Sequence, residues 1–204
     1  MNRNEENANH KKYDVPDQYS EASIRSDYER LTKTLIAKGL TLTTMESCTS
    51  GQIVSLVSDT EGSSAVVKGA YVTYSNEAKI MQGVPAEIIE KYGVYSKETA
   101  AAMAMTSRKS YKSNIGIGVT GTLGNVDVNN ADSVPGHVYF AIDIDWNGNR
   151  ENSGAGEEMD VKAYGGRNIY VYERELLRWP TRYQYKMEIA RAVVDELLHK
   201  FFTK

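Results

Sequence analysis

Short segments rich in β-favouring residues alternate with segments of helical periodicity along most of this chain. Strands are predicted at 40–45, 66–74, 114–119 and 137–145, with an edge strand at 168–175. Helices are predicted at 20–38, 53–57, 76–79, 86–91, 97–112 and 183–201. Such alternation indicates an α/β fold, which we expect to be a three-layer α/β/α sandwich with a mixed sheet. The expected ligand site is a crevice at the strand ends.

Charge and cysteine content exclude several classes of partner and site. The 204 residues hold 24 Lys and Arg against 27 Asp and Glu, a net charge of -3. Without an overall basic field, neither nucleic acid nor a membrane is expected as a partner. A single cysteine, Cys48, excludes an intramolecular disulfide framework and a zinc site of several thiolates. With no apolar run of eighteen residues and no secretion signal, the chain is expected to be cytoplasmic.

The composition changes near Pro16. Residues 1–16 are rich in Asn, Glu and Lys. They bury too little apolar surface to offset the entropy of ordering, which predicts a mobile N-terminal arm. Residues 17–204 are predicted to form a single domain. Apart from the edge strand, the segment 146–178 has no clear pattern, and the sequence leaves its role open.

A group of small polar residues follows the first predicted strand. The run Glu46-Ser47-Cys48-Thr49-Ser50-Gly51 leads directly into an apolar helix. Free N–H groups and the helix dipole at such a turn favour an oxyanion or a phosphate, and a serine there can accept an acyl group. Hydroxyls at a helix start also act simply as caps, so this second interpretation stays open. We interpret the cysteine of this run as a small packed residue.

Two later segments also carry polar groups next to predicted strands. Tyr74 ends one strand, and Lys79 lies on the short helix after it. A lysine desolvated in a crevice can lose its proton near neutral pH and act as base to a serine, although an exposed helix lysine is the alternative. In the run 116–124, Thr120 lies between glycines, where a hydroxyl and backbone donors can meet a phosphate or carboxamide. Close packing of the glycines would explain the same pattern.

Taken together and in this order, these segments resemble the CinA C-terminal domain family, whose enzymatic members are nicotinamide-nucleotide amidases of the PncC type. The resemblance is carried by TTMESCTSG at 43–51, EGSSAVVKGAYVTYSNEAKIMQGV at 61–84, GVYSKETAAAMA at 93–104, IGIGVTG at 115–121 and PGHVY at 135–139. It implies hydrolysis of the carboxamide of nicotinamide mononucleotide to nicotinic acid mononucleotide and ammonia. It implies a small-molecule nucleotide as partner and neither a metal nor a cofactor, and it leaves a homo-oligomer open.

The same resemblance assigns roles to individual residues. Ser47 matches the nucleophile, Lys79 the base, Tyr74 the tyrosine of the YSN segment, and Thr120 a hydroxyl near the reacting centre. The chemistry of these residue types allows Tyr74 to relay the proton from Ser47 to Lys79. The residues assigned to substrate binding are Thr49, Ser50, Gly51, Asn76, Gly121 and Arg182. Backbone N–H groups after the nucleophile are expected to receive the oxyanion, each contributing ~3 kcal/mol or more.

The chain departs from the family pattern at two places near these residues. Ser50 stands where the family has the first glycine of a pair, which places a side chain beside the expected oxyanion site. After Gly121 the chain reads TLGNVD and lacks the proline that would rigidify the family's loop. Both departures favour a second hypothesis, a non-catalytic or regulatory homologue that binds a nucleotide without hydrolysing it. A third hypothesis is acyl transfer or hydrolysis of another amide.

Overall fold

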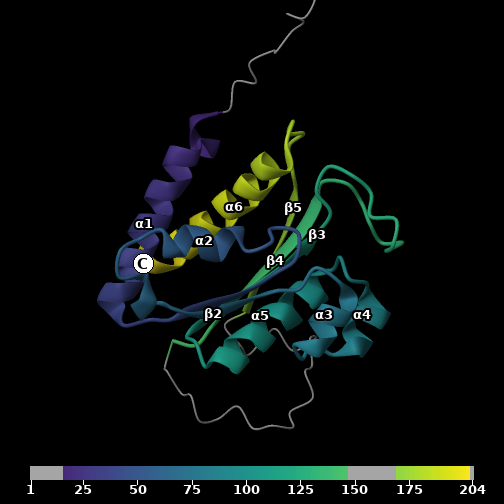
Figure 1. Ribbon diagram of the computed structural model, residues 1–204, viewed down its shortest axis with the longest axis horizontal. Coiled ribbons are helices and arrows are strands. Elements are labelled where there is room, and N and C mark those ends of the chain that lie inside the picture. The colour runs from purple at the N-terminus through teal and green to yellow at the C-terminus, as the bar shows by residue number, and fades with distance from the viewer. Residues whose placement is uncertain (1–15, 147–168, 203–204) are drawn as a thin grey trace, which may run out of the picture.

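The computed structural model describes residues 16–146 and 169–202, which form helices around one five-stranded sheet (Figure 1). The strands lie in the order β2-β1-β3-β4-β5. Their bounds are β1 (Leu42–Glu46), β2 (Val67–Val72), β3 (Ile115–Gly121), β4 (His137–Ile144) and β5 (Ile169–Glu175). Strands β2, β1 and β3 are parallel, whereas β4 and β5 pair antiparallel. The sheet is therefore mixed, as predicted, with β5 at one edge.

Helices cover both faces of the sheet, which confirms the predicted three-layer sandwich (Figure 1). On one face lie α1 (Glu21–Lys38), α2 (Gln52–Ser58) and α6 (Arg182–Phe202). On the other face α5 (Lys97–Tyr111) packs against β3 and β4, with α3 (Asn76–Met81) and α4 (Ala86–Tyr92) beside it. Two short 3-10 helices, η1 (Asp17–Tyr19) and η2 (Ser63–Ala65), precede α1 and β2.

Local capping explains why the helices begin and end where they do. The Ser20 hydroxyl accepts a hydrogen bond from the N–H of Ser23 at 3.2 Å and so begins α1. Gly39 ends that helix with a φ of 62°, a left-handed conformation that glycine adopts without steric cost. Ser96 caps α5 in the same way, through the N–H of Thr99 at 3.1 Å. The predicted bounds of α1 and α5, 20–38 and 97–112, agree with these caps to within one residue.

The alternating residues of β3 explain how both helical layers approach the sheet. Its isoleucines and valine belong to the main core cluster with residues of α1, α2 and α6. Gly116 and Gly118 of β3 face α5, where a Cβ on Gly118 would lie 2.2 Å from the backbone oxygen of Ala100. A side chain at that position would push the helix away. Close packing of the glycines, one of the two interpretations of this segment, is therefore confirmed.

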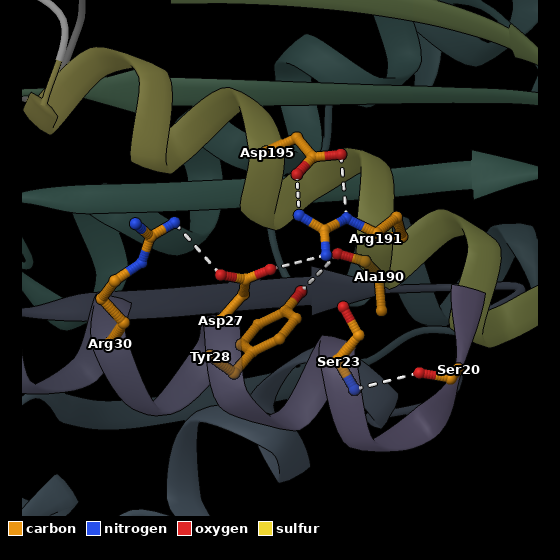
Figure 2. A network of polar contacts seen from close by, with 8 residues as sticks. All are labelled: Ser20, Ser23, Asp27, Tyr28, Arg30, Ala190, Arg191 and Asp195. Atoms are coloured by element: carbon orange, nitrogen blue, oxygen red, sulfur yellow. Dashed lines mark hydrogen bonds and ion pairs between the residues drawn. The ribbon is translucent and has the colours of Figure 1, made fainter. Parts of the chain in front are cut away.

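Helices α1 and α6 are joined by a network of charged and polar side chains (Figure 2). Arg191 of α6 donates to Asp27 of α1 at 2.6 Å and to Asp195 of its own helix. The buried Tyr28 hydroxyl donates to the backbone oxygen of Ala190 at 3.0 Å. The network fixes α6 against α1 and thereby fixes the direction in which α6 begins, next to the strand ends.

The carboxyl ends of the three parallel strands meet at one edge of the sheet, which is where the ligand crevice was predicted.

The expectations for the N-terminal arm and for the first part of segment 146–178 concern residues 1–15 and 147–168, which lie outside the described residues. Within the described ranges, no helix is both long enough and apolar enough to cross a membrane.

Candidate active site

A cavity of about 630 Å³ opens at the carboxyl ends of β1, β2 and β3. Ser47 and Cys48 line it from the turn after β1, residues 74–77 from the segment after β2, and residues between 121 and 130 from the loop after β3. Arg182, at the start of α6, completes the wall. Tyr95, just before α5, also lines the cavity, which therefore collects polar groups from five separate segments of the chain.

Ser47 and Lys79 meet at the inner end of this cavity. The Lys79 Nζ lies 3.2 Å from the Ser47 Oγ, although 32 positions separate the two residues in the sequence. Lys79 is 1% exposed and Ser47 5% exposed. The fold thus forms the contact between hydroxyl and amine on which the predicted chemistry depends.

The remaining contacts of Lys79 define how its amine is oriented. Its Nζ also donates to the backbone oxygens of Thr73 at 2.9 Å and Ser75 at 3.4 Å. Carbonyl oxygens only accept hydrogen bonds, so they hold two N–H groups of the amine. In the uncharged form, the lone pair then points at the third neighbour, the Ser47 Oγ. Burial lowers the pKa of Lys79 from 10.5 to about 8, which leaves about a tenth of the amine uncharged at pH 7.

The turn that carries Ser47 is held by a residue whose role the sequence did not reveal. The fully buried Glu46 carboxylate accepts hydrogen bonds from the N–H groups of Ile53 at 3.2 Å and Val54 at 3.0 Å, and from the Thr44 hydroxyl at 3.0 Å. This carboxylate caps α2, so two of the helix amides expected to be free for an anion are occupied. The only signal in the sequence is a glutamate seven residues before a helix amide, which many turns share.

Cys48 lies next to the nucleophile candidate and belongs to the main core cluster. Burial and the neighbouring Glu46 carboxylate raise the pKa of its thiol to about 12. The thiol therefore stays protonated at neutral pH and is a poor nucleophile. The prediction of a small packed residue is confirmed.

Several predicted site residues lie away from the cavity surface. The buried Thr120 hydroxyl donates to the backbone oxygen of Val94 at 2.8 Å, and Thr120 does not line the cavity. Thr49 is fully buried, and its hydroxyl has no hydrogen-bond partner within the described part of the chain. Thr49, Ser50 and Gly51, which were predicted to bind substrate, do not line the cavity.

Ser50 adopts a conformation that explains why the family has glycine at this position. Its φ is 53°, in the left-handed region, and Gly51 follows with a φ of 86°. The Ser50 hydroxyl donates back to the Ser47 carbonyl at 3.3 Å. Because it is turned to this carbonyl, the extra side chain does not fill the cavity.

Tyr74 and Arg182 form a contact across 108 positions of sequence. The Arg182 Nη2 donates to the Tyr74 Oη at 3.0 Å, and Tyr74 is 62% exposed. Within the described residues, no hydrogen bond joins Tyr74 to Ser47 or Lys79. The predicted relay through Tyr74 is therefore not formed in this structure. Both residues line the cavity, as do the predicted Asn76 and Gly121.

The loop between β3 and β4 is held by hydrogen bonds in place of the family's proline. The Tyr95 hydroxyl donates to Asp127 at 2.5 Å, and the Tyr95 N–H donates to Asp132 at 2.8 Å. Asn130 donates to Asp127 at 2.7 Å and accepts from Asn76, at the start of α3, at 3.1 Å. The loop is thus tied to the starts of α5 and α3. The Tyr95 hydrogen bond also lowers the pKa of Asp127, which stays ionised.

The sequence matches the CinA C-terminal domain model over residues 25–156. Among curated relatives, a CinA-like protein from Flavobacterium psychrophilum is 40% identical over 113 residues, 55% of this chain and 27% of that protein. A CinA-like protein from Citrifermentans bemidjiense is 42% identical over 115 residues, 56% of this chain and 28% of that protein. The chain thus spans a little more than a quarter of the length of these relatives.

Solved structures show the same fold. The competence/damage inducible protein CihA from Agrobacterium tumefaciens has a TM-score of 0.65 and 27% identity, with 84% of this chain and 94% of that chain covered. A CinA superfamily protein from Escherichia coli has a TM-score of 0.71 and 23% identity, with 91% and 93% covered. Because the family model matches more than half of the sequence, the chain belongs to the CinA C-terminal domain family.

Proposed function

We propose that this chain hydrolyses the carboxamide of nicotinamide mononucleotide to nicotinic acid mononucleotide and ammonia, with Ser47 as nucleophile and Lys79 as base. The observation that carries the proposal is the 3.2 Å contact between the Lys79 Nζ and the Ser47 Oγ, buried at the inner end of the cavity. A lysine whose pKa is lowered by burial is a recognised activator of a serine. We also propose a cytoplasmic location, because a single cysteine fits a reducing compartment.

The proton transfers follow from the orientation of the amine. As the Ser47 Oγ attacks the amide carbon, the uncharged Lys79 Nζ takes the hydroxyl proton. The resulting ammonium then gives a proton to the departing nitrogen, so the carbon–nitrogen bond breaks and ammonia leaves. Water attacks the ester that remains on Ser47, with Lys79 again acting as base, and this releases the acid and restores the hydroxyl.

The turn after Ser47 offers donors for the oxyanion that forms in each step. The amides of Ser50 and Gln52 donate to carbonyls of the turn itself, and Glu46 takes two amides of α2. Among the described residues, no backbone or side-chain oxygen accepts a hydrogen bond from the amides of Cys48 and Thr49. These two groups are our proposed oxyanion donors, and one such donor contributes ~3 kcal/mol to transition-state binding.

Arg182 is proposed to bind the phosphate of the substrate. Arg182 lines the cavity, and its guanidinium donates a hydrogen bond to the Tyr74 hydroxyl. A planar guanidinium suits a phosphate because it can donate two parallel hydrogen bonds. Tyr74 is then proposed to position this guanidinium, in place of the proton relay that was expected from its chemistry.

The test is ammonia release from nicotinamide mononucleotide by the purified protein and by Ser47→Ala and Lys79→Ala. Each substitution is expected to lower turnover by about 10³-fold or more, because nucleophile and base act as a unit. Circular dichroism and the melting temperature serve to verify that both variants fold. An inert wild-type protein that still binds the nucleotide would instead favour the non-catalytic homologue.

Two features count against that alternative. The Ser50 hydroxyl faces the Ser47 carbonyl and does not narrow the cavity. The loop after Gly121, which lacks the family's proline, is held through Asp127 and Asp132 instead. Neither departure from the family pattern therefore removes the cavity or the Ser47 and Lys79 contact.

A further inference from the structure

We infer that the cavity selects a zwitterionic ligand, in which the Asp127 carboxylate lies near a cationic ring and Arg182 lies near an anionic group. The inference rests on the proposed function, because it specifies the charge form of the substrate at that same site. It assigns to Asp127 a role in specificity that neither the motifs nor the comparisons assign.

Asp127 carries a negative charge that its protein neighbours leave uncompensated. Its carboxylate accepts hydrogen bonds from the Tyr95 hydroxyl, the Asn130 amide and the N–H of Asn129, at 2.5, 2.7 and 3.0 Å. These donors are neutral, so they stabilise the ionised form without cancelling its charge. Within the described residues, no Lys, Arg or His forms a salt bridge with Asp127. A carboxylate also has about four acceptor positions, so one remains for a ligand.

Arg182 presents the opposite charge in the same cavity and is also held by a neutral group. Its guanidinium donates to the phenol oxygen of Tyr74, and within the described ranges it forms no salt bridge. Asp127 and Arg182 both line the cavity yet do not pair with each other. Two fixed charges of opposite sign in a preformed cavity favour a ligand that carries both complementary charges.

The negative charge lies close enough to the reacting centre to act on a ring attached to the amide. Burial lowers the pKa of Lys79, and the charges of Asp127 and Glu77 both act against that shift. Asp127 and Ser47 line the same cavity, so the field of Asp127 extends into the space beside Ser47. A carboxamide in contact with the Ser47 Oγ brings its ring into the same field. Glu77 also lines the cavity, but it is exposed on α3, where water screens its charge more strongly.

The chemistry that matches both charges is a carboxamide on a ring with a quaternary nitrogen, joined to a phosphate. Nicotinamide mononucleotide has this form. Its reduced dihydropyridine form keeps the carboxamide, the ribose and the phosphate and loses only the ring charge. The two compounds therefore isolate the interaction assigned to Asp127.

The experiment measures the dissociation constants of both compounds by calorimetry, with Ser47→Ala protein to prevent turnover. The oxidised form is expected to bind about tenfold more tightly than the reduced form. Adding Asp127→Asn, which keeps an acceptor for Tyr95, should weaken the oxidised form by about tenfold and the reduced form by less than twofold. Tyr95→Phe is the matched control, because it disturbs the same contact but keeps the charge, and it should keep the preference.

Three results would overturn the inference. One is equal affinity of the Ser47→Ala protein for the two compounds, and a second is a preference that persists in Asp127→Asn. The third is an equal loss for both compounds in Asp127→Asn, which would mean that the residue only shapes the loop. If the folded protein binds neither compound, the proposed function fails together with the inference, whereas the other results leave the proposed function intact.

Discussion

Buried cations have opposite surroundings in two regions of the molecule. One region is the contact between α1 and α6, and the other is the cavity at the strand ends. Arg191 is 13% exposed and lies between the carboxylates of Asp27 and Asp195 (Figure 2). Lys79 is still more buried, yet its hydrogen bonds go to a serine hydroxyl and two backbone oxygens. The positive charge of Arg191 is therefore paired with carboxylates, whereas the amine of Lys79 is hydrogen-bonded only to neutral groups.

The pKa shifts of the two cations follow from this difference. The hydrogen bond to Asp195 raises the pKa of Arg191, whereas burial lowers the pKa of Lys79 to about 8. A paired cation is fixed in its charged form and serves the fold. A buried cation among neutral groups can change its charge near neutral pH, and this makes it useful for proton transfer.

The largest effect is expected from Lys79→Arg, which keeps the charge and the donors but removes the ability to accept a proton. A guanidinium stays protonated in proteins, so it cannot serve as base. Ammonia release from nicotinamide mononucleotide should fall by about 10³-fold, to the level of Lys79→Ala. Lys68→Arg, at an exposed lysine of β2, is the control and should keep full activity. Substantial activity in folded Lys79→Arg would mean that Lys79 acts only as a donor.

The next effect is a pH dependence of the wild-type rate. Only the uncharged amine accepts the Ser47 proton, and its fraction grows as pH rises toward the lowered pKa of about 8. The rate, as kcat/KM for ammonia release, should rise about tenfold per pH unit between pH 6 and 7.5 and level off above pH 8.5. A rate that falls as pH rises through this window would contradict the proposed base.

Replacing each of the two arginines by alanine should show that one contributes to the stability of the fold and the other to binding of the nucleotide. Arg191→Ala leaves Asp27 and Asp195 without their shared cation, so the free energy of unfolding should fall by about 2 kcal/mol while KM stays unchanged. Arg182→Ala should raise KM for the nucleotide by about tenfold and leave the denaturant midpoint unchanged. A raised KM in Arg191→Ala at unchanged stability, or a loss of stability in Arg182→Ala at unchanged KM, would contradict the distinction between the two regions.

Tyr28→Phe, in the contact between α1 and α6, is expected to have a smaller effect on the free energy of unfolding. The substitution removes one buried hydrogen bond, from the hydroxyl to the Ala190 oxygen, and keeps the packing of the ring. The free energy of unfolding in denaturant should fall by about 1 kcal/mol, with no change in ammonia release. A loss of activity at equal stability would show that the two regions are coupled.

The sequence predicted those parts of the fold that depend on local signals. Ser20, Gly39 and Ser96 mark helix ends through bonds to residues at most four positions away, so their pattern is readable along the chain. The pairing of Ser47 with Lys79 was reached in a different way. It follows from the order of several motifs that resemble one family, and the structure then brings the two side chains together.

The remaining site contacts depend on how distant segments meet, which no local pattern contains. Thr120 has the right residue type next to the right glycine, but its hydroxyl is taken by Val94, 26 positions earlier. Glu46 caps a helix only because the turn after it folds back. Asp127 reaches Tyr95 across 32 positions, through a loop whose sequence differs from the family pattern. These contacts are set by packing, which acts after the local choices are made.

The charge state of the Lys79 amine can be measured directly by following the nitrogen and carbon NMR signals of isotopically labelled lysine across pH 6 to 11. The signal of Lys79 is identified by its loss in Lys79→Arg. A titration midpoint near 8, well below that of the exposed lysines, is the expected result. A midpoint near 10.5, the ordinary value for lysine, would mean that the amine beside Ser47 remains charged at neutral pH and cannot take its proton.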